Sequence, residues 1–381
     1  MGGSVVATDP NMLAVVVDQG PPGLIDPYIN GLFASVTICV PGTTTCQVVD
    51  HLLVDTGSYG VRVLESVLHL ALPAVTNASG HGLAECVQFV LGTTWGSVAL
   101  ADVTVGDELA KDLSIQLIGE TTYTMPADCT GTPNMDLQTL GCNGVLGVGP
   151  RLQDCGAACA STGWSNPGIY YACSSAQACA IAAVPVTQQV SNPVAAFPVD
   201  NNGTIIQLGA IGASGAASVS GVLTFGIGTQ SNNGLGSATV LAIDQLDYFG
   251  TTFPVGGTTY TSVLDSGSNG LFFLNTALTN LKMCTGSGFS SWYCPASPTS
   301  LGATLSSLSG AGTTIVFSVA NASRVSASAA AFDMAGPMPN FGPNTTDPSF
   351  DWGLPFFFGR AVYTAIEGQS TPAGVGPYFA F

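Results

Sequence analysis

Two short segments of the chain each place an aspartate directly after an apolar run and two residues before a glycine. They are Leu52-Leu53-Val54-Asp55-Thr56-Gly57-Ser58 and Ser262-Val263-Leu264-Asp265-Ser266-Gly267-Ser268. In each segment an apolar strand would deliver the Asp to a tight turn, in which the Gly permits close backbone approach. The hydroxyl groups of Thr56, Ser58, Ser266 and Ser268 can then orient the two carboxylates by hydrogen bonds.

The chemistry open to such a pair depends on whether the two carboxyl groups meet. Two carboxylates held close together cannot both ionise cheaply, so they share a proton. The ionised partner can take a proton from water while the protonated partner polarises or protonates an amide. Asp55 and Asp265 would thus hydrolyse an amide bond with no covalent intermediate, no metal and no cofactor.

A second signal follows each aspartate further along the chain. Val145-Leu146-Gly147 and Phe357-Phe358-Gly359 are both two apolar residues followed by glycine. A two-part signal that recurs once in each half indicates an internal repeat. If the two halves face one another across a pseudo-twofold axis, Asp55 and Asp265 meet at their interface.

In these motifs the sequence resembles the pepsin-like aspartic protease family, and especially a divergent bacterial branch of largely uncharacterised secreted proteins. The resemblance implies an all-β, bilobal architecture with two β-barrel-like lobes and an active-site cleft between them. It implies that Asp55 and Asp265 are catalytic and that Thr56, Gly57, Ser58, Ser266, Gly267 and Ser268 support them. It also implies that Gly147 and Gly359 lie on segments that pass behind the catalytic turns and complete a psi-shaped crossing.

The resemblance covers nearly the whole chain. Residues 203–209 and 220–223 are similar to the family's entry into its second lobe, and residues 354–381 are similar to its last strands. The exception is the stretch 151–183, which contains four cysteines and is expected to be a surface insertion pinned by disulfides. We therefore expect an N-terminal lobe over 1–200, which includes this insertion, and a C-terminal lobe over 201–381.

One departure from the family concerns the hairpin flap that closes over substrate. The family usually has a flap Tyr that is hydrogen-bonded to a Trp seven residues after the first catalytic Asp. Here that later position is Arg62, and the expected flap, residues 86–105, contains no Tyr. Trp95 beside Gly96 is therefore the candidate to cover the cleft, and Arg62 is a candidate either for substrate contact or for pairing with a nearby carboxylate.

Composition and local patterns support strands over helices. Charged residues make up 8% of the chain, whereas the usual share is about a quarter, and glycine is plentiful. Short β-branched segments flanked by Gly, Asn or Pro predict strands at 35–40, 98–105, 204–208 and 219–225. Residues 64–72 and 274–283 are the best candidates for short helices.

The charge balance limits the kinds of partner. With 23 acidic and 6 basic residues, the formal net charge is −17. Nucleic acids and anionic membranes are poor partners for such a chain, because both need a basic footprint. No apolar run is long enough to span a bilayer. We expect a monomer whose partner is a peptide or protein substrate, and the low number of Lys and Arg favours tolerance of acid.

The cysteines indicate the compartment. Eleven cysteines lie at short spacings, none of them in a CxxC pair or near the three histidines, so disulfides are favoured over metal sites. We expect bonds that close local loops, with connectivity left open and Cys86 as the unpaired thiol. Disulfides imply an oxidising compartment. No signal peptide opens the sequence, and we expect a mature chain that is secreted, extracellular or periplasmic.

The leading hypothesis is an acid-type aspartic endopeptidase that cleaves extended peptides with dyad-activated water. The alternative is a secreted, non-catalytic binding or inhibitor protein that keeps the same fold, motivated by the missing flap Tyr and its Trp partner. A self-processing zymogen is a third, weaker hypothesis. No GxSxG, HExxH or phosphate-binding loop supports a serine hydrolase, a zinc protease or a nucleotide enzyme.

Overall fold

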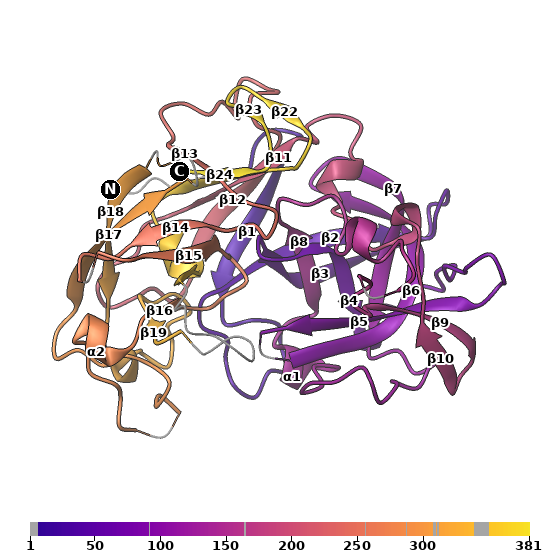
Figure 1. The fold of residues 1–381 in the computed structure, drawn as a ribbon, viewed down its shortest axis with the longest axis horizontal. Coiled ribbons are helices and arrows are strands. Elements are labelled where there is room, and N and C mark those ends of the chain that lie inside the picture. Colours follow the sequence, from indigo (N-terminus) through magenta and orange to yellow (C-terminus); the bar gives the residue numbers. More distant parts are fainter. Residues whose placement is uncertain are drawn as a thin grey trace.

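The computed structural model describes residues 7–381 except 91, 164, 256, 287, 308, 309, 311 and 339–349. In Figure 1 the molecule has two lobes, with the strands of the first half on one side and most of those of the second half on the other. Helical segments within the described residues are short: α1 (Leu137–Leu140), α2 (Thr276–Thr279), and the 3-10 turns η1 (Glu65–Val67), η2 (Gly156–Ala158), η3 (Val186–Gln188), η4 (Val194–Ala196), η5 (Ala322–Arg324) and η6 (Leu354–Phe356).

Strands make up most of the regular structure. Those of the first half are β1 (Met12–Asp18), β2 (Gly31–Cys39), β3 (Cys46–Asp55), β4 (Tyr59–Leu64), β5 (Gly82–Phe89), β6 (Gly92–Val105), β7 (Glu108–Ile118), β8 (Gly144–Val148), β9 (Tyr170–Ser175) and β10 (Ala178–Ile181). Those of the second half are β11 (Gly203–Leu208), β12 (Val219–Phe225), β13 (Val240–Ala242), β14 (Phe249–Thr252), β15 (Thr259–Leu264), β16 (Leu271–Phe273), β17 (Thr299–Ser306), β18 (Gly312–Val319), β19 (Ala335–Gly336), β20 (Phe350–Trp352), β21 (Ala361–Ala365), β22 (Ser370–Thr371), β23 (Gly374–Val375) and β24 (Tyr378–Ala380).

The strands form a barrel, a second sheet and a connecting layer. Strands β6, β7, β4, β8, β3 and β2 pair in that order, and a further pairing of β2 with β6 closes them into a barrel. Strands β1, β12, β11, β21, β24 and β13 extend the same sheet and join the two halves through β1 and β12. Strands β14 to β20 form a separate sheet in the second half. The all-β, bilobal prediction is therefore confirmed, while the lobe boundary at residue 200 stays a prediction.

Burial explains why the strands around the two Asp motifs are so apolar. Strand β8 is buried along its whole length, and β3 is buried over its last four residues, because both have neighbours on two sides. In the second half, the rings of Phe273 and Phe350 stack with centroids 5.3 Å apart, and Trp352 stacks on Phe350 at 5.5 Å. The Phe273–Phe350 contact holds β16 against β20, and the Phe350–Trp352 contact lies within β20.

The local predictions were borne out to different degrees. All four predicted strands are present, as parts of β2, β6, β11 and β12. The predicted helices are much shorter than expected: residues 64–72 contain only η1, and residues 274–283 contain only α2, which is capped by the Asn275 side chain. None of the helices among the described residues is long and apolar enough to cross a membrane.

Ten of the eleven cysteines, all within the described residues, form five disulfides. One of these bonds does not close a local loop, as had been expected for all of them. Four close short loops: Cys39–Cys46, Cys155–Cys159, Cys173–Cys179 and Cys284–Cys294. The fifth joins Cys86 to Cys129, which are 43 residues apart. Cys86 is therefore not the free thiol, and the prediction was wrong because folding pairs Cys86 with Cys129 and leaves Cys142, the nearer neighbour of Cys129 in sequence, unpaired. Cys142 is free and buried, and burial raises its pKa to about 12.

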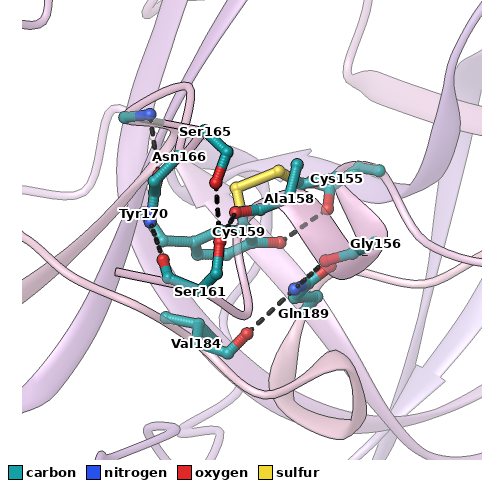
Figure 2. Close-up of a disulfide and its surroundings, with 12 residues drawn as sticks. Cys155, Gly156, Ala158, Cys159, Ser161, Ser165, Asn166, Tyr170, Val184 and Gln189 are labelled. Atoms are coloured by element: carbon teal, nitrogen blue, oxygen red, sulfur yellow. Dashed lines mark hydrogen bonds between the residues drawn. A yellow bond between two sulfur atoms is a disulfide. The ribbon is translucent and has the colours of Figure 1, made fainter. Parts of the chain in front are cut away.

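The Cys-rich segment is pinned by side-chain hydrogen bonds as well as by disulfides. Figure 2 shows the Cys155–Cys159 bond above Gln189, whose side-chain amide donates to the carbonyl oxygens of Gly156 at 2.8 Å and Val184 at 2.9 Å. The amide of Val184 in turn donates to the Cys159 carbonyl at 2.8 Å. This segment leads into β9, which pairs with β5 of the first lobe.

The burial of Cys142 predicts its reactivity. We expect the native protein to resist a water-soluble thiol reagent, because the thiolate is the reactive form and Cys142 is buried with a raised pKa. Unfolding in denaturant without reductant should then expose a single thiol per chain. Spectrophotometric thiol titration followed by peptide mapping checks this assignment, and label on Cys86 or Cys129 would contradict it.

Candidate active site

The two aspartates lie at the ends of equivalent strands. Strand β3 ends at Asp55, and β15 ends one residue before Asp265. Each strand has a parallel neighbour: β8 places Leu146 beside Val54, and β20 places Trp352 beside Leu264. Parallel neighbours bury both sides of each delivering strand, which explains the apolar runs before the two aspartates.

Each carboxyl group receives the same two hydrogen bonds from its own turn. The Gly57 amide donates to Asp55 Oδ1 at 2.7 Å, and Ser58 Oγ lies 2.5 Å from Asp55 Oδ2. The Gly267 amide donates to Asp265 Oδ1 at 2.8 Å, and Ser268 Oγ lies 2.8 Å from Asp265 Oδ2. The internal repeat of the sequence is thus reproduced atom by atom.

The two turns are locked together by reciprocal hydrogen bonds between the residues that follow the aspartates. Thr56 Oγ1 donates to the Leu264 carbonyl at 2.9 Å and accepts from the Ser266 amide at 2.9 Å. Ser266 Oγ donates to the Val54 carbonyl at 2.7 Å and accepts from the Thr56 amide at 3.1 Å. Both side chains are buried, so these four bonds hold the turns in one relative position.

This lock brings the two carboxyl groups into contact. A Cβ atom at Gly57 would lie 2.7 Å from Cγ of Asp265, and one at Gly267 would lie 2.7 Å from Cγ of Asp55, so any larger residue would strike the opposite carboxyl. Burial first, then the charge of Asp265 and a hydrogen bond to it, raise the pKa of Asp55 well above its usual value. The pair can therefore hold a proton. Asp265 is only partly buried and Gly57 is exposed, so solvent reaches the pair.

The glycine behind the second turn is not the one predicted. Gly147 faces Asp55 across the β3–β8 pair, as expected. The corresponding strand in the second half is β20, which is followed by Gly353, and the Asp265 amide donates to the Trp352 carbonyl at 3.2 Å. Gly359 instead packs on Ala210. The prediction failed because an aspartate, Asp351, interrupts the apolar pair before Gly353.

Asp351 is the site residue that the sequence pattern concealed. Its Oδ2 lies 2.6 Å from Ser268 Oγ, the same hydroxyl that bonds Asp265, and its side chain is 7% exposed. The strand pairing shows its place: when Asp55 is aligned with Asp265, Val145 in the β3–β8 pair is equivalent to Asp351 in the β15–β20 pair. An aspartate at that position breaks the apolar pattern, which is why the sequence motif missed it.

The predicted flap and substrate-binding residues, Trp95, Gly96 and Arg62, are all buried. Trp95 is 3% exposed, donates its indole N–H to the Tyr123 carbonyl at 2.9 Å and packs edge-on against Tyr171. Gly96 is buried against the Leu117 carbonyl. Both lie within the barrel wall because β6 is paired on both sides there, which the sequence alone did not reveal.

Arg62 fulfils the second of its two predicted roles, pairing with carboxylates. Its guanidinium is 1% exposed and lies 2.9 Å from both Glu85 and Asp154. Two acidic groups on one buried cation cannot both ionise cheaply. Burial first, then Glu85, raise the pKa of Asp154 well above its usual value. Tyr170 donates to Asp154 at 2.8 Å, which ties the Cys-rich segment into the same cluster.

The β5–β6 hairpin is braced along its outer edge. Strand β9 pairs with β5 from Gly82 to Glu85, and the Cys86–Cys129 disulfide adds a covalent tie. Phe89 near the hairpin tip is partly buried, and the Arg62 guanidinium lies 5.9 Å from its ring centroid. The Phe89 ring is thus within cation–π distance of the buried Arg62 guanidinium.

The two Asp turns face each other, and each is backed by a parallel strand in a bilobal all-β molecule. Among solved structures, the crystal structure of aspartic proteinase from Irpex lacteus is similar in fold, with a TM-score of 0.57 and 13% sequence identity over 97% of this chain and 96% of that chain. In sequence the chain belongs to the family described as "Protein of unknown function (DUF3443)", whose model matches residues 7–381. No curated protein matches the chain in sequence.

The lock between the turns predicts a large effect of one hydroxyl. Thr56→Val keeps the shape of the side chain but leaves the Leu264 carbonyl and the Ser266 amide without partners, so we expect the free energy of unfolding to fall by about 2–4 kcal/mol. Thr56→Ser keeps the hydroxyl and should lose about 1 kcal/mol. Urea denaturation measures both, and equal losses for the two variants would contradict the role of the hydroxyl.

The raised carboxyl pKa values predict greater stability in acid. Asp55, Asp154 and Asp351 are all buried with pKa values well above the usual one, so the folded state holds more protons than the unfolded state. The three carboxyls contribute fully to the free energy of unfolding below about pH 3.9, the pKa of an Asp in the unfolded chain. This contribution is lost as the pH rises toward their raised pKa values in the folded state. We expect the free energy of unfolding to fall between pH 4 and pH 7, and less steeply in Asp154→Asn. Urea denaturation at a series of pH values tests this, and a rise over that range would contradict it.

Proposed function

We propose that the protein is an aspartic endopeptidase with Asp55 and Asp265 as its catalytic pair. The observation that carries the proposal is the contact of the two carboxyl groups on turns locked by Thr56 and Ser266. A shared proton makes the pair an acid and a base at once, which is what water attack on an amide requires. The similar fold of the Irpex lacteus aspartic proteinase supports the proposal.

The mechanism assigns one task to each carboxyl group. Water held between the two groups loses a proton to the ionised carboxylate as its oxygen attacks the amide carbon. The protonated carboxyl donates its proton to the carbonyl oxygen. The other carboxyl then gives the proton that it took from water to the leaving nitrogen as the C–N bond breaks, and the first carboxyl takes its own proton back from the hydroxyl as the carbonyl re-forms. The amide hydrogen bonds from Gly57 and Gly267 hold each carboxyl in its plane during these steps.

The proposed substrate is an extended peptide or an unfolded protein bound between the lobes. An acidic optimum follows from the need to keep one proton on the pair, and the net charge of −17 and the buried neutral carboxyls suit an acidic setting. The five disulfides are consistent with an extracellular or periplasmic protein, and we propose that the chain acts there as a secreted monomer.

A second candidate function is a non-catalytic binding or inhibitor protein with the same fold. The observation that favours it is the flap region, where Trp95 is buried and Arg62 is committed to Glu85 and Asp154. Neither can close over a peptide. A binding protein would retain peptides in the cleft without cleaving them.

Substitution of either aspartate decides between these two functions. Asp55→Asn or Asp265→Asn should lower kcat/KM for an unfolded protein substrate at pH 3–5 by about 10³-fold or more, because neither variant can share a proton as an acid and base pair. A statine-type transition-state analogue should inhibit the wild type and bind both variants more weakly.

The matched control is Asp107→Asn, which neutralises an exposed carboxyl in the turn between β6 and β7 and should leave the rate unchanged. Cleavage that survives in either dyad variant would overturn the catalytic assignment. Wild-type protein that binds a diverse peptide library but cleaves none of it between pH 2 and pH 8 would establish the binding function.

A further inference from the structure

A third carboxyl group stands behind one aspartate of the pair and not behind the other. Asp351 lies beside Val263 in the β15–β20 pair, and its counterpart in the β3–β8 pair is Val145 beside Leu53. Val145 is 3% exposed and Asp351 is 7% exposed. The two halves thus place an apolar residue and an ionisable one in equivalent buried positions.

The contacts of Asp351 require a proton in this cluster. Ser268 Oγ lies 2.8 Å from Asp265 Oδ2 and 2.6 Å from Asp351 Oδ2. A serine hydroxyl has a single hydrogen, so it can donate to only one of these oxygens. If both carboxyls were ionised, the other would face the hydroxyl oxygen at hydrogen-bond distance with no hydrogen between them. A proton on either carboxyl resolves this; with the proton on Asp351, Asp351 donates to Ser268 and Ser268 donates to Asp265.

The remaining oxygen of Asp351 gives a second, independent indication. Asp351 Oδ1 is buried and has no hydrogen-bond partner in the described part of the protein. An ionised carboxylate with one oxygen buried and unpaired is costly, whereas a neutral carboxyl tolerates the same position better.

We infer that Asp351 is a positioning residue that carries a proton at acidic pH and, through Ser268, directs a hydrogen bond onto Asp265. This inference rests on the proposed function of the Asp55–Asp265 pair. The chain of donors runs from Asp351 through Ser268 to Asp265 Oδ2 and stabilises Asp265 as the anion. Asp55, whose flanking position is Val145, is then the partner that keeps the shared proton. Asp265 is assigned as the base and Asp55 as the acid.

Among the described residues, no hydrogen bond or ion pair joins Asp351 to a cation that would favour its ionised form. Of its neighbouring strands, β16 carries no titratable side chain and β15 carries Tyr260, and the charged groups that raise the pKa of Asp351 are Asp265 and, more weakly, Asp55. Burial first, then Asp265, raise the pKa of Asp351 well above its usual value. As the pH rises through that value, Asp351 ionises and adds a negative charge two hydrogen bonds from Asp265. A like charge makes the pair release its last proton at higher pH.

The pH profile of cleavage tests this. Asp351→Asn removes the titrating charge but keeps the shape and a donor for Ser268, and Asp351→Val reproduces the arrangement at Val145. In Asp351→Asn we expect the alkaline limb of kcat/KM to move about one pH unit toward acid, because the neighbouring negative charge no longer forms. Asp351→Val also lacks the donor to Ser268, so its alkaline limb should move less, because loss of that donor destabilises the Asp265 anion and offsets part of the shift. The control is Asp333→Asn, a partly buried carboxyl of the second half with a pKa of about 6 that has no contact with Asp265 among the described residues, and its profile should match the wild type.

Carboxyl 13C chemical shifts in aspartate-labelled protein provide a measurement that does not depend on activity. In the wild type at pH 5, the Asp351 carboxyl, assigned through its backbone, should have the shift of a protonated acid while exposed aspartates are ionised. An ionised Asp351 at pH 5, or an alkaline limb that coincides in the wild type and Asp351→Asn, overturns the inference. If the wild type cleaves nothing at any pH, the proposed function fails, and the 13C shift still decides whether Asp351 holds its proton.

Discussion

The repulsion between two carboxyl groups forced into contact is the constraint on which the rest of the structure depends. When both are ionised, Asp55 and Asp265 repel each other, and each would ionise more easily alone. They stay in contact because Thr56 and Ser266 lock the two turns with four buried hydrogen bonds. The glycines beside them leave space that the opposite carboxyl fills.

Burial of acidic groups is a wider property of this molecule than of the dyad alone. Asp154 shares Arg62 with Glu85, and Asp351 lies behind Ser268, so buried carboxyls with raised pKa values occur both in the barrel wall and beside the Asp pair. With 6 Lys and Arg for 23 acidic residues, the chain has too few cations to pair with every carboxyl, so buried carboxyls that lack a cation of their own favour the protonated form. The same sequence property that gives a charge of −17 therefore ties the folded state to acidic conditions.

The two lobes show how an internal repeat diverges while its geometry is retained. The hydrogen bonds around Asp55 and Asp265 are equivalent, yet one supporting strand contains Val145 and the other contains Asp351. The hairpin of the first lobe is likewise braced by β9 and a disulfide at Cys86. Such asymmetry gives the two aspartates different surroundings, and a shared proton then has a preferred location.

The sequence alone determined the all-β class, the duplicated turns and the identity of the two aspartates, because these depend on local patterns of apolar runs, Gly and hydroxyl residues. Only the tertiary structure decided which segment lies behind the second turn, since strand pairing follows register and not the local apolar count that pointed to Gly359. It also decided that Cys86 is bonded, that Trp95 is buried and that Arg62 pairs with Glu85. These outcomes depend on contacts between residues far apart in the chain, whose burial no short pattern records.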